Sequence, residues 1–119
     1  MTRERLHHIV WFKRDLRVAD NRALARAASQ GPVIPLHVVE PELWAQPDMS
    51  ARHWAFASES LMALRRDLAG LGQPLVIRIG PVEEVLDALG AQMPIAALWS
   101  HEETGNDWTY RRDRRVAAW

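Results

Sequence analysis

Two clusters of ionisable side chains follow apolar runs in this sequence and have the residue types that bind charged or polar ligands. In residues 9–24, IVWFKRDLRVADNRAL, the residues Lys13, Arg14 and Asp15 come directly after the first run. In residues 100–107, SHEETGND, the residues His101 and Glu102 come directly after the last one. Cations in one loop and carboxylates in another form a binding site when the fold brings the two loops together. We therefore ask whether the strands that precede them are neighbours.

The signatures of several common enzyme classes do not occur in the sequence. No G-x-G-x-x-G follows the first apolar run, and no P-loop, H-E-x-x-H or G-x-S-x-G pattern occurs anywhere. The chain has no cysteine, which excludes disulfides, thiolate metal ligands and cysteine nucleophiles. An ordinary dinucleotide oxidoreductase, a P-loop enzyme and a serine hydrolase are all disfavoured, and we expect no metal site.

Apolar runs alternate along the chain with segments of helical period. Four runs rich in Val, Ile, Leu and Trp predict strands at residues 8–12, 33–39, 75–79 and 95–100. Because these runs are continuous and do not alternate with polar residues, they indicate a parallel sheet with helices on both faces. Pro35 conflicts with a regular second strand, so a bulge or a later start is expected there.

Two helices are predicted in the first half of the chain. The first is expected to have Asp20 as its N-cap and to stop at Gly31. The second is expected to run from an N-cap at Ser50 to Leu71, with Trp54 among the apolar residues that recur at intervals of three and four. The linker between the second strand and this helix contains Leu43 and Trp44, which predicts an ordered segment that packs on the domain.

Two further helices are predicted in the second half. Residues 81–89 begin with Pro81 and are followed by Gly90, a typical residue after a helix end. The last helix opens at Asn106 or Asp107 and carries Trp108, Arg112, Val116 and Trp119 on one side. Its basic stretch YRRDRR is interpreted as a solvated or internally paired surface, because closely spaced arginines point in different directions around a helix.

The order of elements predicts an α/β fold with an open, doubly wound, Rossmann-like parallel sheet. The expected strand order is 3-2-1-4, with a fifth strand missing from this chain. Ligands bind beyond the carboxyl ends of such strands where the strand order reverses. That point lies between the first and fourth strands, so Lys13, Arg14 and Asp15 would face His101 and Glu102 across a crevice. We also expect the open edge of the fourth strand to favour self-association.

The composition limits the partners and the location of the protein. Lysine plus arginine and aspartate plus glutamate number 15 each, so the formal net charge is zero and any binding of a polyanion must be local. The first residues lack the apolar core of a signal peptide or a membrane span. Together with the lack of cysteine, this predicts a cytoplasmic protein without a membrane partner.

The segment VWFKRDLRVADNRAL, residues 10–24, resembles the opening signature of the cryptochrome and photolyase family. In that signature a strand ending in Trp-Phe runs into an Arg-Asp-Leu-Arg loop and then an Asp-Asn helix start. The similarity continues in order and spacing through VIPLHVVEPELWAQPDMSARHWAFASESLMALRRDLAGLGQPLVIRIG, residues 33–80. It implies that residues 1–119 are most of the N-terminal α/β domain of such a flavoprotein. A larger helical domain, absent from this chain, would then hold FAD and contact damaged DNA.

The N-terminal domain of this family usually carries a second, light-harvesting chromophore of the folate, deazaflavin, flavin or lumazine type. The resemblance implies that this antenna chromophore contacts Lys13, Arg14, Asp15, His101 and Glu102, with Trp44 as a wall of its site. Three other matching residues are interpreted as structural, because they fix the loop and cap the helix: Arg17, Asp20 and Asn21.

Three functions remain open for the parent protein. It is a photolyase that repairs pyrimidine dimers with light, a cryptochrome that senses blue light, or a stand-alone nucleotide-binding α/β module. The residues expected for dimer repair do not lie in this chain. Residues 1–119 alone are therefore expected to have no catalytic residue, to bind no FAD in the catalytic mode and to repair no DNA.

Overall fold

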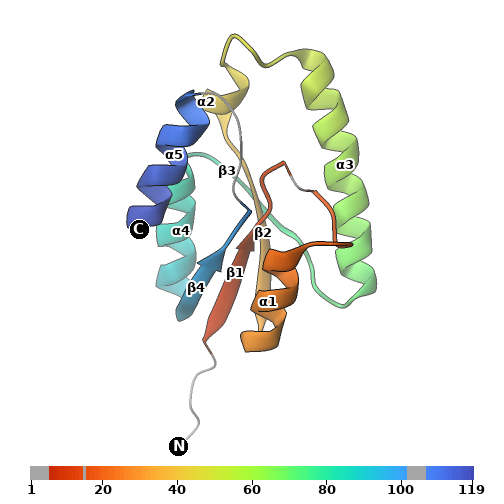
Figure 1. The fold of residues 1–119 in the computed structure, drawn as a ribbon, viewed down its shortest axis with the longest axis vertical. Coiled ribbons are helices and arrows are strands. Elements are labelled where there is room, and N and C mark those ends of the chain that lie inside the picture. The colour runs from red at the N-terminus through yellow and green to blue at the C-terminus, as the bar shows by residue number, and fades with distance from the viewer. Residues whose placement is uncertain (1–5, 15, 102–106) are drawn as a thin grey trace, which may run out of the picture.

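The computed structural model describes residues 6–14, 16–101 and 107–119. Four parallel strands lie in the order β3-β2-β1-β4, and helices cover both faces of the sheet (Figure 1). The predicted α/β fold and its strand order 3-2-1-4 are confirmed. None of the helices in the described residues is long and apolar enough to cross a membrane.

The strands agree with the apolar runs to within one residue at each end. They are β1 (His7–Trp11), β2 (Val33–Val39), β3 (Val76–Ile79) and β4 (Ile95–Trp99). The helices are α1 (Arg22–Gln30), α2 (Pro41–Trp44), α3 (Ala51–Gly70), α4 (Val82–Gln92) and α5 (Asp107–Ala118). Helix α2 lies in the linker that was expected to be ordered.

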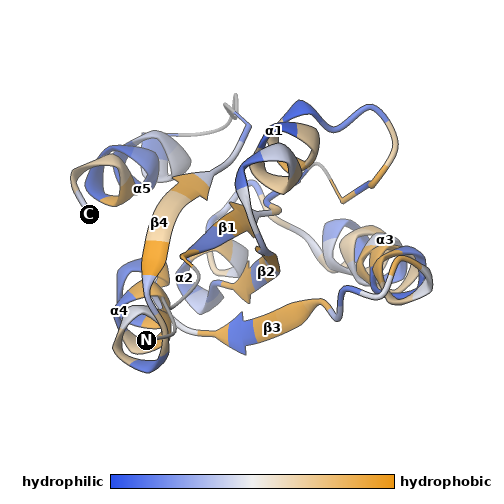
Figure 2. Cartoon of the chain, turned by 90° about the horizontal axis from the view of Figure 1, so that it is seen from below, coloured by the Kyte–Doolittle hydropathy of each residue, from blue (hydrophilic) through white to orange (hydrophobic). Residues whose placement is uncertain are grey.

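Two apolar cores lie on opposite faces of the sheet. The core under α4 and α5 contains Ile9, Trp11, Ile34, Leu36, Val38, Val82, Val85, Leu86, Leu89 and Val116. The core under α1 and α3 contains Val10, Phe12, Ala23, Ala27, Leu64 and Leu68. Figure 2 shows the apolar strands between the two layers of helices. Because Ile9, Val10 and Trp11 of β1 enter the two cores in turn, these successive residues are all apolar.

The expected N-cap of the first helix is wrong by one residue. The side chain of Asn21, not that of Asp20, accepts a hydrogen bond from the Leu24 amide at 3.0 Å. Asp20 instead has a positive φ of 52°. Both residue types form caps and tolerate this left-handed region, so the path of the loop decides between them.

The expected end of the helix after Pro81 is also wrong. Helix α4 continues through Gly90 to Gln92. The chain leaves the helix at Met93, which has an extended backbone (φ −154°, ψ 153°) and precedes Pro94. A proline disfavours helical geometry in the residue before it, so Pro94 ends this helix and Gly90 does not.

Pro35 lies in an interior strand without a bulge between β1 and β2, contrary to expectation. The Phe12 amide donates to the Leu36 carbonyl, and the Gly80 amide to the Val39 carbonyl, so the odd-numbered residues of β2 face β3. Pairing with β3 begins only at Leu36. The nitrogen of Pro35 therefore points to the β3 side before that ladder starts, where no donor is needed.

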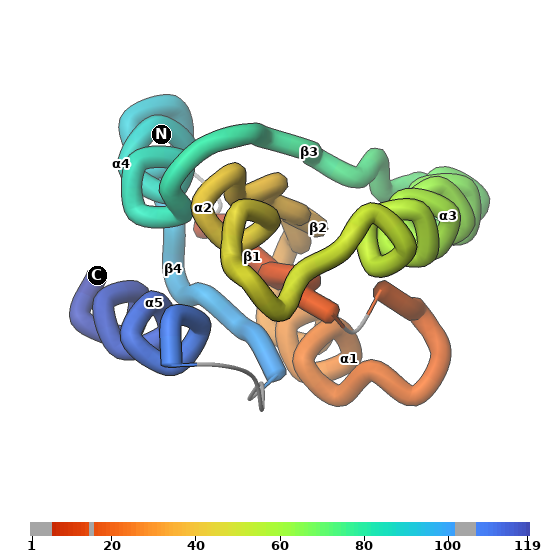
Figure 3. Tube along the Cα trace, turned by 90° about the horizontal axis from the view of Figure 1, so that it is seen from above, coloured from red at the N-terminus to blue at the C-terminus, as the bar shows by residue number. Residues whose placement is uncertain are grey.

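Helix α3 packs on the sheet mainly through its second half. Its N-cap is Ser50, as predicted, and His53 completes a capping box. Leu64 and Leu68 are each 1% exposed, but Trp54 is 41% exposed and is not in the core. Instead, Trp54 contacts Trp44 edge-on, with ring centroids 4.9 Å apart. In Figures 1 and 3 the first half of α3 connects with α2 beyond the sheet.

Replacing Leu64 by alanine should lower the free energy of unfolding by about 2 to 5 kcal/mol, because it removes a buried side chain and leaves a cavity. The matched control is Met62→Ala on the same helix, where the side chain is 70% exposed and the cost should stay within about 0.5 kcal/mol. Urea denaturation of both variants measures the difference. Equal losses would contradict the packing of α3 described above.

Candidate functional site

A cavity of about 640 Å³ opens at the carboxyl ends of β1 and β2. Figure 3 looks onto this edge, where α2 and its connection to α3 pass over the strands. This volume lies within the range of about 300 to 1,000 Å³ that is typical of small-molecule sites. The lining residues are Trp11, Lys13, Arg14, Leu16, His37, Val38, Glu40, Leu43, Trp44, Asp48, Met49, Arg52, His53, Phe56, Ala57, Ser60 and Arg112.

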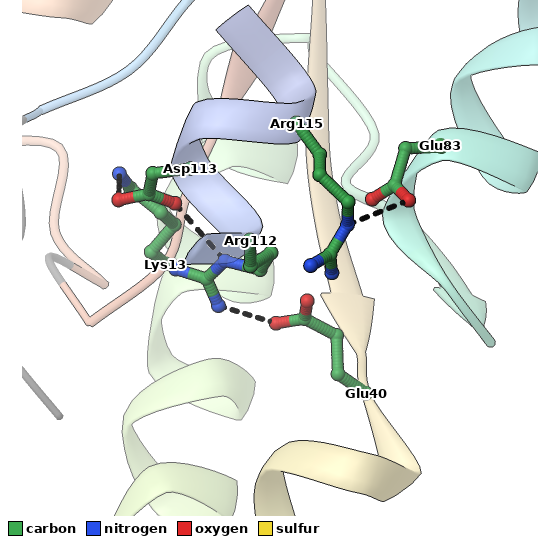
Figure 4. Close-up of polar contacts among 6 residues, drawn as sticks. All are labelled: Lys13, Glu40, Glu83, Arg112, Asp113 and Arg115. Carbon is green, nitrogen blue, oxygen red and sulfur yellow. Dashed lines mark hydrogen bonds and ion pairs between the residues drawn. The ribbon is translucent and has the colours of Figure 1, made fainter. Parts of the chain in front are cut away.

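A buried ion pair between α5 and the end of β2 forms part of this lining. Arg112 Nη1 donates to Glu40 Oε2 at 2.7 Å, and the two side chains are only 2% and 6% exposed. Arg112 Nε also donates to Asp113 Oδ1 at 3.0 Å. Figure 4 shows the guanidinium between the two carboxylates. Arg112 Cζ also lies 4.9 Å from the centre of the Trp11 ring. The arginine thus joins three segments that lie far apart in the sequence: α5, the end of β1 and the residue after β2.

Lys13 is held in the same region by a second ion pair. Its Nζ lies 3.2 Å from Asp113 Oδ2, and its side chain is only 5% exposed. The same nitrogen lies 4.9 Å from the centre of the Trp11 ring, a separation typical of a cation–π contact. Burying a cation is costly unless it is paired, so Asp113 makes this position of Lys13 feasible.

The cavity brings together three of the residues that the sequence assigned to a ligand. Lys13, Arg14 and Trp44 all line it. His101 does not, because its Nε2 lies 3.0 Å from Asn21 Oδ1 and 3.4 Å from the Ala23 amide at the start of α1. The remaining two, Asp15 and Glu102, lie outside the described residues.

Within the described residues, the cavity lies on the β2 side of β1, not on the β4 side that the reversal of strand order indicated. Both sides have the carboxyl ends of parallel strands. The cavity lies on the β2 side because the segment after β2 crosses toward α3 and supplies Leu43, Trp44 and Met49 as an outer wall. In the sequence, these apolar residues of the linker were the feature that could have indicated the outer wall.

Several lining residues were missed from the sequence. His37 Nδ1 lies 2.8 Å from the Phe12 carbonyl; a carbonyl only accepts, so this nitrogen carries the proton. Glu40, Arg52 and Phe56 gave no distinctive pattern. Arg112 had one signal, since it lies four residues before the apolar Val116 and therefore on the same helix face.

The family model for DNA photolyase matches residues 8–119, and the chain belongs to this family. Cryptochrome DASH, chloroplastic/mitochondrial, from Arabidopsis thaliana is 35% identical over 103 residues, which cover 81% of this chain and 18% of that protein. The deoxyribodipyrimidine photo-lyase of Salmonella typhimurium is 45% identical over 71 residues, which cover 58% of this chain and 15% of that protein. The chain thus spans less than a fifth of the length of these relatives.

Solved structures agree with this assignment. An archaeal photolyase from Sulfolobus tokodaii, described with two FAD molecules and the implication of a novel light-harvesting cofactor, superposes with a TM-score of 0.83 at 28% identity. The match covers 95% of this chain and 26% of the archaeal one. A class III photolyase from Agrobacterium tumefaciens gives a TM-score of 0.78 at 30% identity, covering 99% and 25% of the two chains.

The variant Arg112→Met should lower the free energy of unfolding by about 3 to 5 kcal/mol, because it leaves the buried Glu40 carboxylate without the guanidinium. A double variant with Glu40→Gln as well should recover most of this loss. In the control Arg115→Met, the lost contact to Glu83 is exposed and should be worth at most about 1 kcal/mol. Denaturation at low and high salt measures all three. A loss for Arg112→Met no larger than that for the control would contradict the buried pair.

Proposed function

We propose that the cavity at the carboxyl ends of β1 and β2 holds an antenna chromophore, and that the chain is the chromophore domain of a photolyase-type flavoprotein. The observation that carries this proposal is the set of aromatic rings in a cavity of suitable size. Trp11, His37, Trp44 and Phe56 all line it. Flat aromatic side chains favour a flat ligand, because ring faces and edges pack well against one another.

The residues around these rings fit the same kind of ligand. Lys13 and Arg112 are neutralised by Asp113 and Glu40, so the deep part of the cavity presents polar groups without a net formal charge. Folate, deazaflavin, flavin and lumazine are all heteroaromatic rings with polar edges, and each suits such a lining. When bound, such a chromophore absorbs light and passes the excitation energy to the flavin. Lys13, Arg14 and Trp44 are our proposed contacts to it.

For the parent protein we propose light-driven repair of pyrimidine dimers in DNA, with FAD held by a helical domain that is not part of residues 1–119. The similarity to the Salmonella photolyase supports this activity. The similarity to cryptochrome DASH supports the alternative, a blue-light sensor with the same domain. The absence of cysteine supports a cytoplasmic location.

Dimer repair can be tested on the full-length natural protein with ultraviolet-damaged DNA. Under blue light we expect loss of pyrimidine dimers, measured by chromatography of the digested DNA, and no loss in the dark. Residues 1–119 alone should show none in either condition. A light-induced change in flavin absorption without any repair would favour the sensor instead.

Filling the cavity should remove the antenna chromophore without removing a ligand contact. Ala57 lines the cavity, whereas Ala55 is exposed and does not. In the full-length protein, Ala57→Trp should therefore abolish the absorption band of a second chromophore, while Ala55→Trp and the natural protein keep it. The absorption spectrum of the released cofactors measures this. If both variants retain the second chromophore, the proposed location is wrong.

A further inference from the structure

We propose that protonation of His53 loosens the outer wall of the cavity, so that the wall is ordered at neutral pH and frays in mild acid. The basis is the cap of α3, in which a histidine occupies a position that glutamate or glutamine usually takes. The inference concerns the wall itself. Only its consequence for a bound chromophore rests on the proposed function.

Two hydrogen bonds between Ser50 and His53 make up this cap. The His53 amide donates to Ser50 Oγ at 3.3 Å, and the Ser50 amide donates to His53 Nδ1 at 3.2 Å. The second bond needs a neutral imidazole, because both ring nitrogens of the protonated form carry a hydrogen and only donate. Protonation at Nδ1 therefore breaks this bond and leaves the Ser50 amide without its acceptor.

The positive charge itself also acts against the start of the helix. His53 lies in the first turn of α3, which has no acidic residue, at the positive end of the helix dipole. The charged and titratable groups that line the cavity with His53 come from α3, from the linker before it, from the ends of β1 and β2, and from α5: Arg52, Asp48, Lys13, Arg14, His37, Glu40 and Arg112. Neither carboxylate in this set is without a partner. Among the described lining residues, none therefore offers an unpaired negative charge to a protonated His53.

The first turns of α3 depend on the cap because tertiary packing supports them little. Residues 51–56 are all exposed, and the buried residues Leu64 and Leu68 lie two turns or more further along the helix. Trp54 directly follows His53 and contacts Trp44, with ring centroids 4.9 Å apart. This contact joins the first turn to α2, so fraying of the turn also releases Trp44 from its place in the wall.

The direction of the pH effect follows from the cap. Histidine side chains change charge between about pH 5 and 8. Above this range the imidazole is neutral and both bonds of the cap are made. Below it, one bond is lost and a cation stands at the helix start. The outer wall should therefore lose stability as the pH falls.

Hydrogen–deuterium exchange of the full-length natural protein, measured by mass spectrometry at about pH 7.5 and about pH 5.5, tests the inference. Each exchange rate is divided by the intrinsic rate at the same pH. In peptides covering residues 50–57, protection should fall about threefold to tenfold on acidification, as expected for loss of a capping interaction. In peptides covering residues 64–70, where the helix is buried, it should change less than about twofold.

The matched control is His53→Gln, because a glutamine at this position accepts the same hydrogen bond and does not titrate. It should keep its protection at both pH values, and every other histidine is the same in the two proteins. His53→Ala should show the lower protection at both values. No loss of protection in the natural protein, or an equal loss in the natural protein and in His53→Gln, would overturn the inference.

Release of a second chromophore is measured separately, by its dissociation rate after dilution. It should be about threefold to tenfold faster at the lower pH in the natural protein and unchanged in His53→Gln. The same pH dependence in both proteins would contradict a role of the wall in holding the ligand. If the natural protein carries no second chromophore, the proposed function fails, while the exchange experiment still decides the inference about the wall.

Discussion

The ion pair between Arg112 and Glu40 fixes the relation between the last helix and the sheet. Arg112 comes from α5 and Glu40 directly follows β2, so 72 residues of chain separate two side chains that meet at 2.7 Å. Such a pair contributes little net stability, because the loss of hydration offsets much of the attraction. The two side chains must nevertheless meet at this position, since either charge would otherwise be buried without its partner. We infer that the pair serves to position α5 and the floor of the cavity.

The outer wall of the cavity is built by different means. It contains α2 and the first turns of α3, which have few buried residues. Local interactions stabilise it: the capping box of Ser50 and His53, and the edge-on contact of Trp44 with Trp54. One side of the cavity thus belongs to the sheet and its two cores, while the other depends on contacts within a short segment. In such an arrangement the free energy of local unfolding differs between regions, and it is lower for the outer wall than for the sheet.

Much of the fold could be predicted from the sequence because the two central strands, β1 and β2, are buried on both faces. Continuous apolar runs predicted the limits of the strands to within one residue, and the common doubly wound arrangement predicted their order. The helix ends were harder. Asp20 and Asn21 are adjacent cap-forming residues, and Gly90 was followed four residues later by the true stop, Pro94. In each case two nearby residues were of a suitable type, and the tertiary structure determines at which of them the helix begins or ends.

The site was predicted only in part. Lys13, Arg14 and Trp44, which the resemblance assigned to the antenna chromophore, line one cavity at the carboxyl edge of the sheet, and their contact with a ligand stays a prediction. The topology did not indicate which neighbour of β1 would share that cavity, because this depends on the path of the linker after β2. Arg112 was missed because a run of arginines usually lies in solvent. Helical period placed it on the inner face with Val116, and here periodicity was a better guide than charge.

Pro35 has a consequence for the pairing of β3. Its nitrogen faces the β3 side just before the first paired residue, Leu36. If β3 slid by two residues toward the amino end of β2, one of its carbonyls would face this nitrogen and receive no hydrogen bond. A slide by a single residue would turn the side chains of β3 to the opposite face. The proline therefore acts as a built-in stop against misregistration of a strand only four residues long.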